Sequence, residues 1–291
     1  MIIGHQKQRQ FLKKAVESDR MPHAYLFSGM EKLGKKKVAL EMLSLAFGKE
    51  LENISHPDLI IIEPQAKEIK IEQIRSLIWQ LSLKSYSSPL KAVLINKAHT
   101  MNQEAQTAFL KTLEEPRGRV VLILISEHPD YLLPAILSRV QNIKFYPVKK
   151  KEIVDYLKKV GLSDEKAENI SQITLGRPGL AIDLVKDPSL LEEFNEKIEN
   201  FDRLAASDLN YRVQYVKELA EDPLCVKEAL EAWTVYLRNQ MLSILKSDKV
   251  KTRYSLNKLK KIIEKIQETR LLTATTNVDP KLALEILMLE L

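Results

Sequence analysis

The chain has 291 residues, of which 45% are hydrophobic and 29% are charged, and it carries a formal net charge of +6. This balance is typical of a soluble globular protein and excludes an intrinsically disordered chain. No apolar run approaches the roughly 20 residues that span a bilayer, so a membrane protein is also excluded.

The N-terminal residues and the cysteine content bear on location and partners. The segment Met1–Lys7 lacks the features of a secretory signal, so we expect a cytoplasmic location and no membrane partner. Cys225 is the only cysteine, which excludes an internal disulfide and a cysteine zinc cluster. The positive charge fits a polyanion, but Lys and Glu alternate along helical stretches, so direct DNA contact and a solvated Lys/Glu surface both stay open.

The first half of the chain alternates short apolar runs with helical patterns. Continuous apolar runs suit strands that are buried on both faces of a sheet. The candidate strands are Ala24–Phe27, Leu59–Ile62, Ala92–Ile95, Val120–Ile125 and Ile143–Tyr146. Their alternation with helices predicts an α/β fold with a parallel sheet covered by helices.

Several residues mark the ends of the predicted helices. A helical run covers Lys37–Phe47, and Asn102 can cap the helix Gln103–Glu114, which Pro116 ends. Pro147 marks the end of the sheet domain. Short helices follow, one of them with Ser163 as its N-cap. The pattern predicts an α/β domain over residues 1–148 and a small helical domain over residues 149–206.

The last part of the chain reads as helical throughout. All eight glycines lie at or before Gly179, and apolar residues then recur three and four positions apart, as in Tyr211–Leu245 and Leu256–Leu272. The Asp279–Pro280 turn introduces a final helix, Lys281–Leu289. We predict a helical domain over residues 207–291, whose apolar stripe around Trp233 can serve as core or as an oligomer interface.

A phosphate-loop pattern follows the first predicted strand. Gly29, Gly34 and Lys35 satisfy the spacing G-x-x-x-x-G-K, and a helical run comes next. Glycines let backbone N–H groups curl around phosphate oxygens at the positive end of a helix, and the lysine reaches the terminal phosphates. The order of strand, loop and helix supports a nucleotide-type site.

At three positions on which ATP hydrolysis depends, this chain has residues that cannot play the required role. The residue after Lys35 should be Ser or Thr, whose hydroxyl binds Mg²⁺, but Lys36 has no lone pair to offer. Asp and Glu should follow the strand Ala92–Ile95, but Asn96 and Lys97 stand there. A lysine cannot orient water as a carboxylate does, and its charge opposes the metal. We expect no ATP hydrolysis, whereas residual nucleotide binding to the loop stays open.

Five segments spread along the chain carry a family resemblance. They are Ile2–Gly4, His23–Phe27, Gln106–Pro116, Leu137–Val140 and Asn277–Glu285. Together with the phosphate loop they resemble the AAA+ subunits of bacterial DNA polymerase III clamp loaders. The fourth segment is similar to the family's Ser-Arg-Cys motif, with valine in place of the cysteine, and the fifth is similar to the end of the collar domain.

Two subunit types share this architecture, the gamma/tau motor, which hydrolyses ATP, and the delta-prime type, which does not. The residues Lys36, Asn96 and Lys97 favour the delta-prime type, and the chain ends at Leu291 without the extension of a tau protein. The resemblance implies an AAA+ domain, a helical lid and a C-terminal oligomerisation collar. It also implies a heteropentamer with gamma/tau and delta subunits, which loads the sliding clamp onto primer-template DNA in replication.

The resemblance assigns a role to one arginine. In the family, the arginine of the Ser-Arg-Cys motif projects toward the ATP of a neighbouring subunit. Arg139 is therefore expected to act as an arginine finger in trans, supported by Ser138, because a guanidinium offsets charge on a transferred phosphoryl group. The alternative is a surface salt bridge. Arg177 lies where a lid approaches the nucleotide, and we expect a structural role for it.

The remaining expectations concern zinc and other functions. Related subunits often carry a four-cysteine zinc module where this chain has Phe47–His56, so we expect no zinc and no other cofactor. A divergent gamma-type ATPase motor would rely on Lys35 alone, and a helicase loader would bind DNA tightly as an isolated chain. The histidines are expected to pack or to form hydrogen bonds; they are His5, His23, His56, His99 and His128.

Overall fold

The computed structural model of this chain describes residues 2–51, 56–86, 88, 90–116, 118–246, 253–275 and 279–291. Asn277 and Val278 of the predicted collar motif, and part of the segment Phe47–His56, lie outside these residues. The chain divides into two compact units, residues 1–167 with 176–181, and residues 168–175 with 182–291. The division into three domains stays a prediction.

A five-stranded parallel sheet forms the centre of the first unit, with the strand order β2-β3-β4-β1-β5. The predicted α/β fold is confirmed. The first four strands coincide with the predicted runs to within one residue at each end. The strands are β1 (Ala24–Ser28), β2 (Leu59–Ile62), β3 (Lys91–Ile95), β4 (Val120–Ser126) and β5 (Gln141–Lys144).

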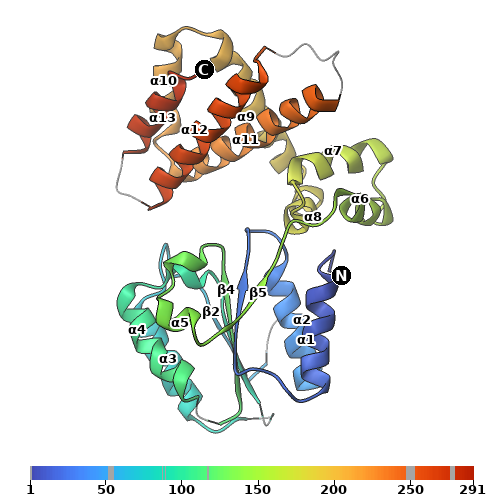
Figure 1. Cartoon of the computed structure of the whole chain (residues 1–291), viewed down its shortest axis with the longest axis vertical. Coiled ribbons are helices and arrows are strands. Elements are labelled where there is room, and N and C mark those ends of the chain that lie inside the picture. Colours follow the sequence, from blue (N-terminus) through green and yellow to red (C-terminus); the bar gives the residue numbers. More distant parts are fainter. Residues whose placement is uncertain are drawn as a thin grey trace. The chain divides into compact units, whose positions relative to one another are not determined.

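Helices cover both faces of this sheet (Figure 1). One face carries α1 (Gln6–Glu17) and α2 (Lys35–Phe47), and the other carries α3 (Ile71–Ser82) and α4 (Gln103–Glu114). Along β1, Tyr25 and Phe27 join the core beneath α1 and α2, whereas Leu26 joins the core beneath α3 and α4. Successive side chains of a strand point to opposite faces, so the central strands must be apolar throughout.

The fifth strand lies two residues earlier than the sequence predicts. The prediction was Ile143–Tyr146, but β5 comprises Gln141–Lys144, of which only Ile143 is buried. This strand forms the edge of the sheet beside β1, and an edge strand needs few apolar residues. Phe145 misled the prediction because its ring packs on Phe27 from outside the strand, with ring centroids 5.1 Å apart.

The predicted cap of α4 is confirmed. The amide N–H of Ala105 donates to Asn102 Oδ1 at 2.9 Å, which satisfies one of the free donors at the start of the helix. The buried Gln106 then joins two loops, since its Nε2 donates to Met101 O and Tyr131 O, each at 3.0 Å, and its Oε1 accepts from Leu133 N at 2.8 Å. The loops contain the 3-10 helices η2 (Ala98–Thr100) and η3 (Pro129–Tyr131), and α5 (Pro134–Leu137) follows.

Three helices follow the sheet. The turn before the last of them and the start of that helix belong to the first unit, within which Val148 N–H donates to Gly176 O at 2.8 Å and Gly179 N–H donates to Lys32 O at 2.7 Å. Ser163 lies at the start of the second helix as predicted, and its backbone oxygen accepts from Ala167 N at 2.9 Å. The helices are α6 (Lys150–Lys159), α7 (Asp164–Thr174) and α8 (Pro178–Lys186).

The second unit is helical, as the sequence predicts. Its core surrounds the fully buried Trp233, whose indole N–H donates to Lys197 O at 2.9 Å and whose ring lies 5.4 Å from that of Phe201. Leu245, further along the same stripe, is exposed. No helix among the described residues is long and apolar enough to cross a membrane. The helices are α9 (Ser189–Ala206), α10 (Leu209–Leu219), α11 (Pro223–Lys246), α12 (Leu256–Thr275) and α13 (Pro280–Met288).

Candidate functional site

The phosphate-loop residues lie between β1 and α2, at the carboxyl-terminal edge of the sheet. Gly29 N–H donates to Ser126 O at 3.1 Å, and Gly29 has a φ of 141°. A Cβ atom on Gly29 would lie 2.4 Å from the backbone oxygen of Phe145. Gly34 has a φ of 91°, a left-handed conformation that glycine adopts at little cost. Both loop glycines are therefore required by the backbone itself.

The side chain of Lys35 is turned back into the loop from which it comes. Its Nζ donates to Met30 O at 2.5 Å and also to Gly29 O, and the residue is 5% exposed. Burial lowers the pKa of Lys35 to about 8, and the carboxylates of Glu127 and Glu31 partly oppose that decrease. In this conformation Lys35 stabilises the loop by donating to its carbonyl groups.

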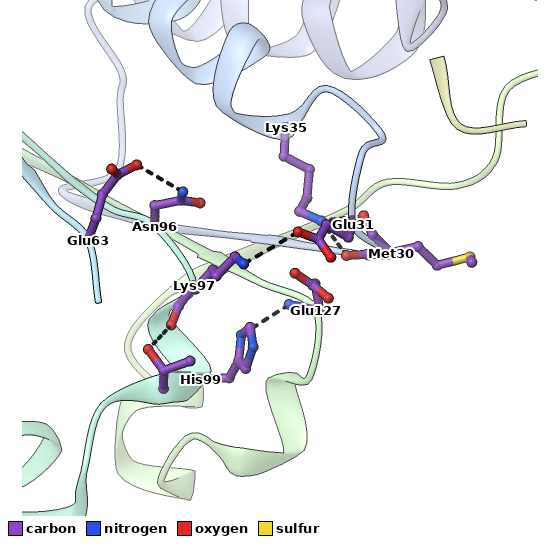
Figure 2. A network of polar contacts seen from close by, with 10 residues as sticks. Met30, Glu31, Lys35, Glu63, Asn96, Lys97, His99 and Glu127 are labelled. Carbon is purple, nitrogen blue, oxygen red and sulfur yellow. Dashed lines mark hydrogen bonds and ion pairs between the residues drawn. The ribbon is translucent and has the colours of Figure 1, made fainter. Parts of the chain in front are cut away.

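Lys36 and Asn96 share a single carboxylate, that of Glu63. Lys36 Nζ donates to Glu63 Oε1 at 2.8 Å, and Asn96 Nδ2 donates to the same oxygen at 3.1 Å (Figure 2 shows the second bond). The hydrogen bonds from Lys36 and Asn96 lower the pKa of Glu63. Two of the positions that would bind Mg²⁺ in an ATPase of this class are therefore joined by an ion pair and a hydrogen bond.

Lys97 reaches from the end of β3 to the phosphate loop. Its Nζ lies 3.4 Å from Glu31 Oε1, and Figure 2 shows this ion pair beside the ammonium group of Lys35. Lys97 itself has a φ of 52°, and its backbone oxygen accepts from Thr100 Oγ1 at 2.8 Å. A carboxylate of the loop thus neutralises the lysine that replaces the expected water-orienting acid.

His99 lies on the same edge and contacts the end of β4. Its Nδ1 is 3.4 Å from Glu127 N and 3.4 Å from Ser126 Oγ, and its ring meets that of His128 edge-on at 5.4 Å. Burial lowers the pKa of His99 to about 4, and the charges of His128 and Lys97 act in the same direction. The ring is therefore neutral at neutral pH and fits an acceptor role at Nδ1.

The acidic partners at this edge were not identified from the sequence. Glu63 and Glu127 directly follow β2 and β4, and carboxyl ends of parallel strands meet at one edge of a sheet, so this rule could have located them. Glu31 lies inside the loop, where its carboxylate opposes bound phosphate. The structure brings together all six predicted loop and strand residues: Gly29, Gly34, Lys35, Lys36, Asn96 and Lys97.

Arg139 and Ser138 lie apart from this group, after α5, which packs on the sheet face that α3 and α4 cover (Figure 1). Arg139 Nη2 forms an ion pair with Glu114 Oε1 at 2.6 Å. Its Nη1 donates to Ala135 O at 2.9 Å and to Ser138 Oγ at 3.1 Å. The side chain is 37% exposed. The salt bridge of the alternative interpretation is thus present, and the guanidinium group is still accessible.

Arg177 lies in the turn between α7 and α8 and is 7% exposed. This turn packs closely on neighbouring backbone, because a Cβ atom on Gly176 would lie 2.7 Å from Val148 O. The burial of Arg177 fits the expected structural role. Among the residues that the structure describes, no group of three or more His, Cys, Asp and Glu side chains is arranged to hold a metal ion. The expectation that the chain binds no zinc stays a prediction.

A family model and two curated relatives agree on the family of this chain. Residues 4–149, half of the chain, match the family described as DNA polymerase III, delta subunit. The delta' subunit of DNA polymerase III from Bacillus subtilis is 33% identical over 179 residues, which cover 57% of this chain and 54% of that protein. The delta' subunit from Pseudomonas aeruginosa is 34% identical over 134 residues, which cover 40% and 41%. The chain thus matches about half the length of these relatives, or less.

A solved structure agrees on the fold. The crystal structure of a DNA polymerase III gamma subunit-related protein from Thermotoga maritima matches 97% of both chains with a TM-score of 0.55 and 22% identity. At this level of identity the match shows a shared fold and nothing finer. The family match over residues 4–149 and the two delta' relatives confirm the resemblance in the sequence: the chain belongs to the DNA polymerase III delta-prime family of clamp-loader subunits.

Proposed function

We propose that this chain is a delta-prime subunit that does not hydrolyse ATP and that presents Arg139 to ATP bound by a neighbouring gamma/tau subunit. It acts as a stator in a heteropentamer with gamma/tau and delta subunits, which loads the sliding clamp onto primed DNA. The observation that carries the silent role is the charge pairing at the edge of the sheet, where Lys36 and Asn96 share Glu63 and Lys97 pairs with Glu31.

This pairing opposes each step of ATP hydrolysis. A magnesium ion beside Lys36 would meet an ammonium group in place of a hydroxyl oxygen, and like charges repel. A water molecule beside Lys97 would meet a group that cannot accept its proton. The ammonium group of Lys35 already donates to Met30 O and Gly29 O, so a phosphate would compete with these carbonyl groups for it. We therefore expect neither magnesium-dependent hydrolysis nor a resident cofactor.

The exposure of Arg139 supports the proposed role in trans. The residue follows a helix of four residues, α5, and 37% of its side chain is exposed, so a neighbouring subunit can contact it. A guanidinium keeps its charge at any physiological pH and offers planar donors that match a phosphate group. In other systems such an arginine raises the rate by roughly 10³ to 10⁵.

A gamma-type motor is the second candidate, because the chain also resembles motor subunits. The tau/gamma subunit of Haemophilus influenzae is 31% identical over 153 residues, which cover 47% of this chain and 22% of that protein. A motor needs the metal and water positions that Lys36, Asn96 and Lys97 now occupy. The geometry therefore favours the silent subunit.

The test is ATP turnover by a clamp loader reconstituted from gamma and delta subunits with this chain. We expect no turnover by the chain alone, and lower turnover by the complex that contains Arg139→Ala, with assembly unchanged in size-exclusion chromatography. Arg139→Lys, which keeps the charge but loses the planar fork, should restore little. Equal turnover with wild type and Arg139→Ala would reject the finger. Turnover by the isolated chain that Lys35→Ala abolishes would make it a motor.

A further inference from the structure

Glu114 is the one residue from another helix that holds the guanidinium group of Arg139 among the contacts of the described residues. We propose that Glu114 is a positioning residue, which presents Arg139 in the orientation that meets a neighbour's phosphate. This inference rests on the proposed finger role of Arg139. It adds a second residue, on α4, on which the efficiency of that arginine depends.

The three acceptors around Arg139 differ in what they fix. Ala135 O and Ser138 Oγ belong to α5 and the residue after it, so they move with the arginine itself. Glu114 lies 25 positions earlier, in the last turn of α4, and its Oε1 is 2.6 Å from Arg139 Nη2. Among the residues that the structure describes, only this contact ties the guanidinium group to a different element of the fold.

The helix that carries Glu114 is firmly held. Phe109 and Leu113 of α4 are fully buried in the core beneath the sheet, and Asn102 caps the start of the helix. Gln106 of the same helix binds backbone groups of Tyr131 and Leu133, in the segment that leads to α5. The ion pair therefore transfers the rigidity of α4 to the end of a flexible side chain.

The remaining donors leave room for a phosphate. A guanidinium group has five N–H donors. The contacts with Glu114, Ala135 and Ser138 use three of them. Two N–H groups are then left to donate to phosphate oxygens while the pair with Glu114 persists. Orientation and phosphate contact are thus compatible in one conformation.

Stability alone does not account for Glu114. The side chains of Arg139 and Glu114 are 37% and 48% exposed, and an ion pair at such exposure adds little to the stability of a fold. A carboxylate in the last turn of a helix also opposes the helix dipole, so Glu114 weakens α4 slightly. An orienting role explains why α4 carries a carboxylate at this position, where its ion pair adds little stability and its charge opposes the helix dipole.

The test compares Glu114→Ala, Glu114→Gln and the matched control Glu115→Ala in the reconstituted complex. Glu115 is exposed, and its carboxylate lies one residue further along the chain. We expect Glu114→Ala to lower kcat for ATP roughly twofold to fivefold, the range open to an exposed ion pair, with KM and assembly unchanged. Glu114→Gln should recover part of the loss, because its amide oxygen still accepts from the guanidinium group. Glu115→Ala should equal wild type.

A double-mutant cycle separates the outcomes. In the Arg139→Ala background, Glu114→Ala should cause no further loss. If Arg139→Ala itself has no effect, the finger role fails and this inference fails with it. If Arg139→Ala lowers turnover but Glu114→Ala leaves it unchanged, the inference alone is wrong. A rise in kcat with Glu114→Ala would also overturn it, since the pair would then restrain the arginine.

Discussion

Gly29 fixes the shape of the phosphate loop more firmly than any other glycine in it. We predict that Gly29→Ala destabilises the first unit by about 2–4 kcal/mol, because the new Cβ atom would lie 2.4 Å from Phe145 O in a backbone with a φ of 141°. Gly34→Ala is the control, since its new Cβ atom would have no atom within 4 Å apart from its chain neighbours. Only the left-handed φ would then cost stability, about 1–2 kcal/mol. Urea denaturation of the two variants checks the order, and equal losses would contradict the steric argument.

Lys35 should leave a signature in the pH dependence of stability. Burial lowers its pKa from 10.5 to about 8 in the folded chain. Between these values the unfolded chain binds more protons at this residue, so its contribution to the free energy of unfolding rises with pH. The neutral amine can still donate to Met30 O and Gly29 O.

We therefore predict that wild type gains stability relative to Lys35→Met as the pH rises from about 8 toward 10.5. Other alkaline groups, such as tyrosines, titrate in both proteins and cancel in the difference. Denaturant midpoints at a series of pH values provide the measurement. A difference that stays constant over this window would show that the Lys35 ammonium is not desolvated in the folded chain.

At the scale of single helices and strands, α4 allows the contribution of an N-cap to the free energy of unfolding to be measured. Asn102→Ala should lower the free energy of unfolding by about 1 kcal/mol, because Ala105 N–H loses its acceptor. Asn102→Asp keeps an oxygen at the same place and should remain close to wild type. Thermal unfolding of the three proteins decides between a capping role and a general effect of substitution at this position.

Individual strands and helices also show what sequence patterns can predict. The central strands and α4 follow from continuous apolar runs and from one capping residue, because both features are local in sequence. β5 was misplaced because an edge strand needs only one buried residue, Ile143, and Phe145 packs from outside it. Glu31 was missed because it lies inside the loop and pairs with Lys97 from a distant segment, whereas the position of Glu63 at the end of β2 could have identified it.

At the scale of the whole molecule, the two units have separate hydrophobic cores. A substitution that destabilises one core should therefore leave the stability of the other unit unchanged. Trp233→Ala should destabilise the second unit by about 3–5 kcal/mol, since the ring is fully buried and its N–H is bonded to Lys197 O. Hydrogen exchange should then accelerate in α9 and α11, while the amides of β1, β3 and β4 keep their protection. Trp79→Ala, at a side chain that is 63% exposed, should change neither. Faster exchange in the central strands of the Trp233 variant would show that the units unfold together.

The paired charges at the edge of the sheet have a consequence for how the subunit responds to its surroundings. A protein that binds a ligand only when folded gains stability as the free ligand concentration rises above its dissociation constant. Here Glu31 and Glu63 already supply the counter-charges that Lys97 and Lys36 require, so folding of this edge needs no external ion. The melting temperature of the chain should then be insensitive to Mg²⁺ alone, whereas a rise with added ATP or ADP would reveal residual nucleotide binding to the phosphate loop. This edge of the sheet would then keep its paired charges whether free Mg²⁺ is abundant or scarce, because its counter-charges are part of the chain itself.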